Sequence, residues 1–165
     1  MSLVYWPSPI LKKVSEPLTE APDPELIATM QKVMYDHNGA GLSAIQIGIA
    51  KQLIVIDNQA PDPRVFVNAQ IVAEGPTSAY LAREGCLSIP GVFEYVRRPG
   101  EITVTYRDEN FMLHENVVFR GFTAHALSHE IEHTKGIVFV DHLTPARRSA
   151  IRVKMLNLKK VGMLK

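Results

Sequence analysis

Helical spacing of apolar residues, together with residues suited to helix ends, predicts three helices along this chain. The first covers 24–37, where the apolar positions are Leu26, Ile27, Met30, Val33 and Met34. The second covers 121–136 and ends at Gly136, a residue suited to a left-handed cap. The third begins at Pro145, with Thr144 as its N-cap, and its buried stripe is Ile151, Met155 and Leu158.

Strands are predicted mainly between the first and the second of these helices. Residues 52–57 and 64–74 are rich in β-branched and other apolar residues, so both are expected to be strands. Residues 102–106 alternate between apolar and polar side chains, and after a polar turn the chain returns over 114–119, which predicts a β-hairpin. A short strand is also predicted over 137–140.

The remaining segments are rich in proline or glycine. Residues 1–22 contain four prolines and predict an extended lead-in over the surface, and residues 75–100 are expected to be irregular. Because the strands come mostly in a block between helices, the expected fold class is α+β. Mixed or antiparallel sheets would pack around the helix of 121–136, with a further helix at the C-terminal end. The chain shows no repeat and no long linker, so residues 1–165 are expected to form a single domain.

The composition excludes several classes of protein. Apolar residues make up 46% and charged residues 21%, which is typical of a soluble globular protein, and no apolar run approaches the roughly 20 residues of a membrane span. The first residues lack the basic and apolar regions of a signal peptide. Cys86 is the only cysteine, so no intramolecular disulfide can form and a reducing compartment is favoured. The expected location is the cytoplasm, or an organelle matrix if a transit peptide has been removed.

Charge is distributed unevenly along the chain. Residues 144–165 contain seven basic and no acidic residues, whereas the rest of the chain contains 11 basic and 17 acidic residues. The tail therefore carries +7 and the remainder −6. Such segregation is consistent with a polyanionic partner for the tail, although a solvated face on a terminal helix explains it equally simply.

The sequence His129-Glu130-Ile131-Glu132-His133 is an H-E-x-x-H array within the second predicted helix. Residues four apart lie on the same helix face, so both imidazoles can reach one metal ion, with Glu130 beside it as a candidate base. His125 extends the stripe by one turn. It would lie about 12 Å along the axis from His133, so it is expected in a pocket wall or at the surface rather than as a ligand.

Several residues could supply a third ligand. Cys86 lies in Glu84-Gly85-Cys86-Leu87-Ser88, and a thiolate suits zinc or ferrous iron, but a lone cysteine is often just a small buried apolar residue. Asp141 and His142, downstream of the array, are alternatives. Spacing alone does not choose among these three residues.

Three motifs together resemble a known family. They are Gly39-Ala40-Gly41-Leu42-Ser43-Ala44-Ile45-Gln46, Glu84-Gly85-Cys86-Leu87-Ser88 and His129-Glu130-x-x-His133. In this order and at these gaps they are similar to the signature motifs of the peptide deformylases, and the resemblance runs over essentially the whole chain.

The resemblance implies a role for each matching residue. It implies that the metal ligands are Cys86, His129 and His133. Glu130 would be the general base, and Gln46 with the backbone N–H of Leu87 would stabilise the oxyanion on the formyl oxygen. From its residue type alone, Gln46 could equally be a buried glutamine that hydrogen-bonds to backbone.

Further residues would bind or support the substrate. The expected methionine pocket is walled by Ala40, Phe122, His125 and Ala126. Gly41 would contact the peptide backbone, and Glu84 would support its loop by pairing with Arg98. The chain also departs from the family's pattern, at Ser43, Phe93, Ser128, Glu132 and Thr134. Phe93 stands where some relatives have a substrate-binding arginine. Glu132 replaces an aspartate, and with its longer side chain it would support a metal-binding imidazole by accepting a hydrogen bond from the ring N–H.

The implied function is a metal-dependent hydrolase that removes the formyl group from N-formylmethionine of nascent polypeptides and releases formate. The resemblance implies one divalent metal, Fe²⁺, although the ligand set would also accept Zn²⁺ or Ni²⁺. The expected partners are nascent formyl-Met peptides and the ribosome, the latter through residues 144–165, with no membrane and a monomeric state. One alternative is a catalytically impaired relative that binds nascent peptides or the ribosome. Another is an H-E-x-x-H endopeptidase with Asp141 or His142 as its ligand.

Overall fold

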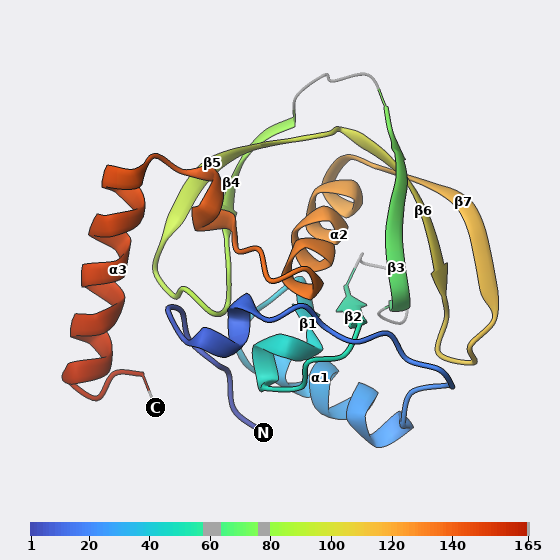
Figure 1. Ribbon diagram of the computed structural model, residues 1–165, viewed down its shortest axis with the longest axis horizontal. Helices are drawn as coiled ribbons and strands as arrows, with labels where there is room; N and C mark the ends of the chain where they lie inside the picture. Colours follow the sequence, from blue (N-terminus) through green and yellow to red (C-terminus); the bar gives the residue numbers. More distant parts are fainter. Residues whose placement is uncertain (58–63, 76–79, 165) are drawn as a thin grey trace.

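The computed structural model describes residues 1–57, 64–75 and 80–164, and five of its strands pair into one antiparallel sheet (Figure 1). The order in this sheet is β1-β2-β3-β6-β7, with the strands β1 (Gly41–Ser43), β2 (Leu53–Ile56), β3 (Arg64–Glu74), β6 (Glu101–Arg107) and β7 (Leu113–Arg120). A separate antiparallel ribbon joins β4 (Tyr80–Gly85) to β5 (Phe93–Arg98). The α-helices of the described residues are α1 (Pro24–Asp36), α2 (Gly121–Thr134) and α3 (Pro145–Lys160). The expected α+β class with antiparallel sheets is confirmed.

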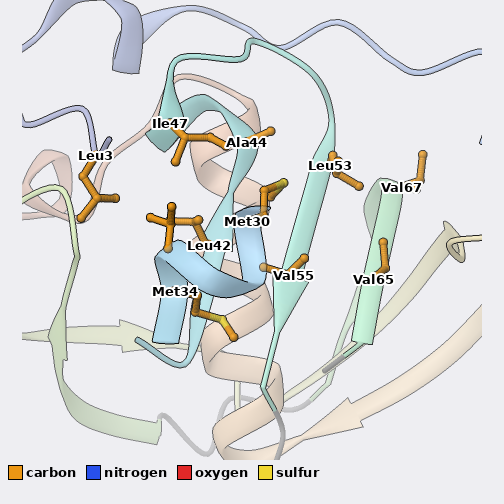
Figure 2. Packing of buried hydrophobic residues seen from close by; sticks show 11 residues of the cluster. Leu3, Met30, Met34, Leu42, Ala44, Ile47, Leu53, Val55, Val65 and Val67 are labelled. Atoms are coloured by element: carbon orange, nitrogen blue, oxygen red, sulfur yellow. The ribbon is translucent and has the colours of Figure 1, made fainter. Parts of the chain in front are cut away.

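Two of these helices cover opposite faces of the sheet because β2 is apolar at every position. Successive side chains of a strand point to opposite faces. Leu53 and Val55 therefore pack in one cluster with Met30 and Met34 of α1 (Figure 2). Their neighbours in β2 pack on the other face, in a cluster with the α2 residues Ala124, Leu127 and Ile131. This second cluster fixes α2 against the sheet.

The ends of the helices follow the sequence signals. The Asp23 carboxylate accepts a hydrogen bond from the backbone N–H of Glu25 at 2.9 Å, and the Thr144 hydroxyl accepts one from the N–H of Arg147 at 3.3 Å. Gly136 has φ +74°, and a Cβ at this position would lie 2.5 Å from the carbonyl oxygen of Lys12. The three predicted helices are thus confirmed, as are the caps at Gly136 and Thr144, whereas the Asp23 cap was not predicted.

The prediction that residues 75–100 are irregular was wrong, because β4 and β5 lie within this range. The ribbon buries Glu84, Val96 and Arg98 on its inner face. Two of these three buried side chains are charged, so the apolar alternation that normally marks a strand is absent.

Two further predictions need correction. Residues 139–142 form a 3₁₀ turn rather than part of a strand, and the Asp141 carboxylate accepts a hydrogen bond from the N–H of Val138 at 2.9 Å. The lead-in 1–22 is largely extended, but it contains a 3₁₀ turn at Pro9–Lys12 and buries Leu3, Trp6 and Leu11. These residues belong to the core rather than to a surface segment. Within the described residues, no helix is both long and apolar enough to cross a membrane.

Candidate active site

The side chains of Cys86, His129 and His133 converge in the interior. All three residues are buried, and one ligand atom from each lies within 4.8 Å of the others. His133 Nε2 is 3.3 Å from Cys86 Sγ and 3.1 Å from His129 Nε2. Helix α2 presents both imidazoles on one face, and the segment after β4 brings the thiol to them. We call these three residues the thiol–imidazole cluster. One sulfur and two nitrogen donors at this spacing fit a borderline-soft divalent metal.

The rival ligands lie outside this cluster. The Asp141 carboxylate pairs with Lys12 and with Arg148, whose Nη2 is 3.2 Å away. His142 Nε2 lies 2.9 Å from the carboxylate of Glu132. Neither side chain belongs to the group of donors that contains His129 and His133.

A pocket of about 480 Å³ opens directly onto the cluster. Its wall includes Cys86, His129 and Glu130, so a molecule in the pocket can reach both the metal position and the carboxylate. The residues expected to contact the substrate also line it: Ala40, Gly41, Leu87, Phe122, His125 and Ala126. His133 and Gln46 lie behind this surface.

Glu130 is held in place by close contact with the strand at the edge of the sheet. A Cβ on Gly41 would lie 2.9 Å from Glu130 Oε1, so only glycine lets the backbone approach the carboxylate this closely. The carbonyl oxygen of Glu130 accepts a hydrogen bond from the Ser43 hydroxyl at 2.7 Å. Burial raises the pKa of the Glu130 carboxyl.

Gln46 is almost completely buried beside the cluster. Its Oε1 accepts a hydrogen bond from the N–H of Ser43 at 2.8 Å, so the amide oxygen is satisfied by backbone. Its Nε2 lies 3.3 Å from Ser88 Oγ and 3.5 Å from Cys86 Sγ. The amide oxygen is therefore fixed, while the amide nitrogen is directed toward the thiol.

Glu84 connects the cluster to a buried arginine. Arg98 donates to both of its oxygens, from Nε at 2.6 Å and from Nη2 at 2.7 Å. His129 Nδ1 contacts Glu84 Oε1, and His125 Nε2 lies 3.0 Å from Oε2. Burial by itself raises the pKa of Glu84, but the hydrogen bonds from Arg98, His125 and His129 hold it well below its usual range. An ionised Glu84 fixes the His129 ring with Nε2 directed at the cluster.

Glu132 contacts the same guanidinium nitrogen of Arg98 that Glu84 contacts. Its Oε2 accepts a hydrogen bond from Arg98 Nη2 at 3.0 Å, and the carboxylate also contacts His142. The imidazole that Glu132 contacts is therefore that of His142, not that of a cluster residue. The sequence interpretation missed the contact between Glu132 and His142, because both residues were considered only in relation to the metal. It also missed the bond between Ser43 and Gln46, although their three-residue separation matches a capping box.

Replacing Arg98 with methionine is expected to destabilise the protein by about 3–5 kcal/mol, because Glu84 would remain buried without its cation. Urea unfolding followed by circular dichroism measures this free energy. The matched control is Arg120→Met, which removes the partner of Glu101 from a pair whose side chains are 70% and 33% exposed. That change should cost less than about 1 kcal/mol. Equal costs for the two variants would contradict a structural role for the Glu84–Arg98 pair.

Comparison with known proteins places this site in context. The model of the polypeptide deformylase family matches residues 1–149. A peptide deformylase of Mesorhizobium japonicum is 38% identical over 164 residues, covering 96% of this chain and 92% of that protein. One from Cellvibrio japonicus is also 38% identical, covering 98% and 97% of the two chains. The crystal structure of a peptide deformylase from Legionella pneumophila superposes with a TM-score of 0.88 at 36% identity, covering 99% of this chain and 98% of that chain.

Proposed function

Because this chain belongs to the polypeptide deformylase family, hydrolases that remove the N-formyl group from nascent peptides, we propose that Glu130 is the general base of that reaction. One observation carries the assignment. The Glu130 carboxylate lines the same pocket as Cys86 and His129, two of the three residues of the thiol–imidazole cluster. A base and a metal position are therefore both within reach of one bound peptide.

Cys86, His129 and His133 are the residues that would hold the metal. When bound, the metal would act as a Lewis acid toward the formyl carbonyl and make a water molecule more acidic. Ferrous iron is the proposed native metal on the basis of family membership, and the same donor set would also accept Zn²⁺ or Ni²⁺ in purified protein. Glu84 and Arg98 support this site by fixing the ring of His129.

Glu130 moves the proton in this proposal. Its carboxylate takes a proton from the attacking water and delivers it to the nitrogen of the methionine when the C–N bond to the formyl group breaks. Formate and a free amino terminus are the products. The raised pKa of the buried carboxyl suits both transfers, because a base that must later act as an acid works best when its pKa lies near the working pH.

Gln46 and Leu87 are proposed to stabilise the negative charge on the formyl oxygen. The Gln46 amide is held by Ser43 on one side and lies beside Cys86 on the other, so its position is fixed before substrate binds. Leu87 follows Cys86 directly in the sequence and lines the pocket, which supports the proposal that its backbone N–H contacts the formyl oxygen. A fixed donor of this kind typically contributes about 2.7–4 kcal/mol to catalysis.

The methionine side chain is proposed to occupy the pocket between α2 and the edge of the sheet. Ala40 and Ala126 are small and leave room for it, His125 forms part of the wall, and Phe122 is half exposed at the opening. The backbone of Gly41 is available to the peptide main chain. An apolar pocket beside a few fixed polar groups is the usual form of such a site.

The experiment that tests this function is formate release from a short formyl-Met peptide. The protein is purified without oxygen and loaded separately with iron, nickel and zinc. Turnover with iron or nickel supports the proposal. One bound metal per chain without turnover would favour the alternative, a deformylase-like protein that only binds nascent peptides; no observation made on this chain favours that alternative.

We further propose that residues 144–165 attach the protein to the ribosome. Helix α3 exposes most of its basic side chains, including Arg148, Arg152 and Lys159. If four of them contact phosphates, the affinity for ribosomes is expected to fall about 50-fold between 50 and 200 mM salt. Co-sedimentation measures this, with Lys159→Glu/Lys160→Glu as the test variant and Lys32→Glu as a control. Salt-insensitive association would exclude an electrostatic contact.

The proposed cellular location follows from the proposed substrate, a formylated nascent chain. Formylated chains are made in the bacterial cytoplasm and in organelles, and this protein would act there. A monomer is sufficient for this proposal, because one chain supplies every residue assigned to the site.

A further inference from the structure

The outward face of the β4–β5 ribbon carries two arginines and two aromatic residues. Arg83 pairs with Tyr95 in the register, and Gly85 pairs with Phe93. Phe93 and Tyr95 are 56% and 62% exposed, and Arg83 and Arg97 are exposed as well. Alternate residues of a strand share a face, so these four side chains lie on the side opposite the buried Glu84 and Arg98. We call Arg83, Phe93, Tyr95 and Arg97 the arginine–aromatic face.

This face continues directly from the substrate pocket. Arg83, Gly85 and Phe93 line the pocket together with Cys86 and Glu130. The Phe93 ring lies against Gly85, where a Cβ would come within 2.6 Å of the ring. The guanidinium carbon of Arg83 is 5.8 Å from the centre of the same ring. Glycine at position 85 thus lets the Phe93 ring approach the backbone of β4 closely.

The surroundings of Arg83 are positively charged. Glu94 lies next to Phe93, but its carboxylate is engaged by Arg147 of α3, with Nε 2.6 Å away. A second cavity of about 220 Å³ lies between the ribbon and α3, lined by Arg83, Phe93, Arg147 and Lys154 among others. Lys154 donates to the carbonyl oxygen of Gly91 at 2.7 Å and so stays at this position. Among the described residues, the charged side chains that line this cavity are all basic, whereas the carboxylates of Glu84 and Glu130 line the substrate pocket.

We propose that the arginine–aromatic face is a subsite for the residues that follow the formyl-methionine, and that it selects acidic side chains there. The proposal rests on the proposed function, because it assigns the pocket to a formylated peptide. A guanidinium binds a carboxylate through paired hydrogen bonds, and the aromatic rings offer apolar surface to the aliphatic part of glutamate. Continuity with the pocket favours a peptide over RNA, since a peptide seated at the cluster must leave along its wall.

The test compares peptides that differ in one residue. A formyl-Met-Ala-Ala-Ala-Ala series carries a single Glu or a single Lys at each position from the second to the fifth, and kcat/KM is measured for the metal-loaded protein. At one or two positions the kcat/KM of the Glu peptide is expected to exceed that of the Lys peptide about five- to tenfold, because exposed charge pairs each change affinity a few-fold. The preference should shrink at high salt and reverse in Arg83→Glu. The matched control is Arg64→Glu, which changes net charge equally at an exposed position outside the pocket lining.

A binding measurement separates this proposal from the proposed function. The same peptides are titrated by calorimetry into Glu130→Gln, which is not expected to consume them. Tighter binding of Glu peptides, lost in Glu130→Gln/Arg83→Glu, supports the subsite even if the wild-type protein releases no formate. Equal affinities and equal kcat/KM values for Glu and Lys at every position overturn it. So does salt-dependent binding of a short RNA that Arg83→Glu abolishes while the peptides remain indistinguishable.

Discussion

Glu130→Gln is expected to slow formate release about 10²- to 10⁴-fold, the usual contribution of a positioned general base, while one metal per chain remains bound. Glutamine has nearly the same shape as glutamate, so the close approach of Gly41 should be preserved. An amide cannot accept the proton of the attacking water. The rate constant kcat and the metal content of the same sample, measured by elemental analysis, together test this prediction.

A matched control for this experiment is Glu115→Gln, which removes a carboxylate from the exposed side of β7. It should leave kcat and metal content unchanged. Near-normal turnover in Glu130→Gln would remove Glu130 from the role of base. Loss of the metal in that variant would instead mean that Glu130 helps to form the metal site.

Cys86→Ala is expected to lose the metal and, with it, all turnover above background. Loss of an outer-shell partner of a metal ligand already costs about 10- to 100-fold in metal affinity, and loss of one of three ligands should cost more. Competition with a chelator measures the affinity, and urea unfolding shows whether the variant remains folded. Cys86→Ser keeps the size of the side chain and offers a weaker donor. Its metal affinity should lie between those of the wild type and Cys86→Ala.

The result that would contradict this prediction also has a specific meaning. Stoichiometric, tight metal binding by Cys86→Ala would show that another residue supplies the third ligand. Asp141 and His142 would then return as candidates, although both contact other side chains in this structure.

Most of the framework could be predicted because local patterns carry it. Apolar spacing and caps identified all three α-helices, and the alternation in 102–106 identified the hairpin of β6 and β7. The array His129 to His133 indicates a metal site from local spacing, since a helix places residues four apart on the same face. These features depend on residues close together in the sequence.

The features that were missed depend on contacts between distant segments. The β4–β5 ribbon buries the Glu84–Arg98 salt bridge beside Val96, so the apolar alternation that marks a strand is absent from its sequence, although the pairing itself was expected. The choice of Cys86 over Asp141 and His142 came from family resemblance, because no local pattern brings residue 86 to residue 133. The partner of Glu132 was missed for a related reason. His142 is ten residues away and reaches it only because a 3₁₀ turn follows α2.

The position of β1 has a consequence for the timing of protein biogenesis. This three-residue strand pairs with β2 on one side only, and residues 39–41 form part of the pocket wall on the other. An edge strand of this kind can pair with a peptide only if the peptide is extended. If the proposed substrate peptide pairs with β1 in this way, its amino terminus must be extended rather than folded into a domain. Chains grow at about 5–20 residues per second, so a nascent chain has only seconds between emergence and folding in which its formyl group can be removed.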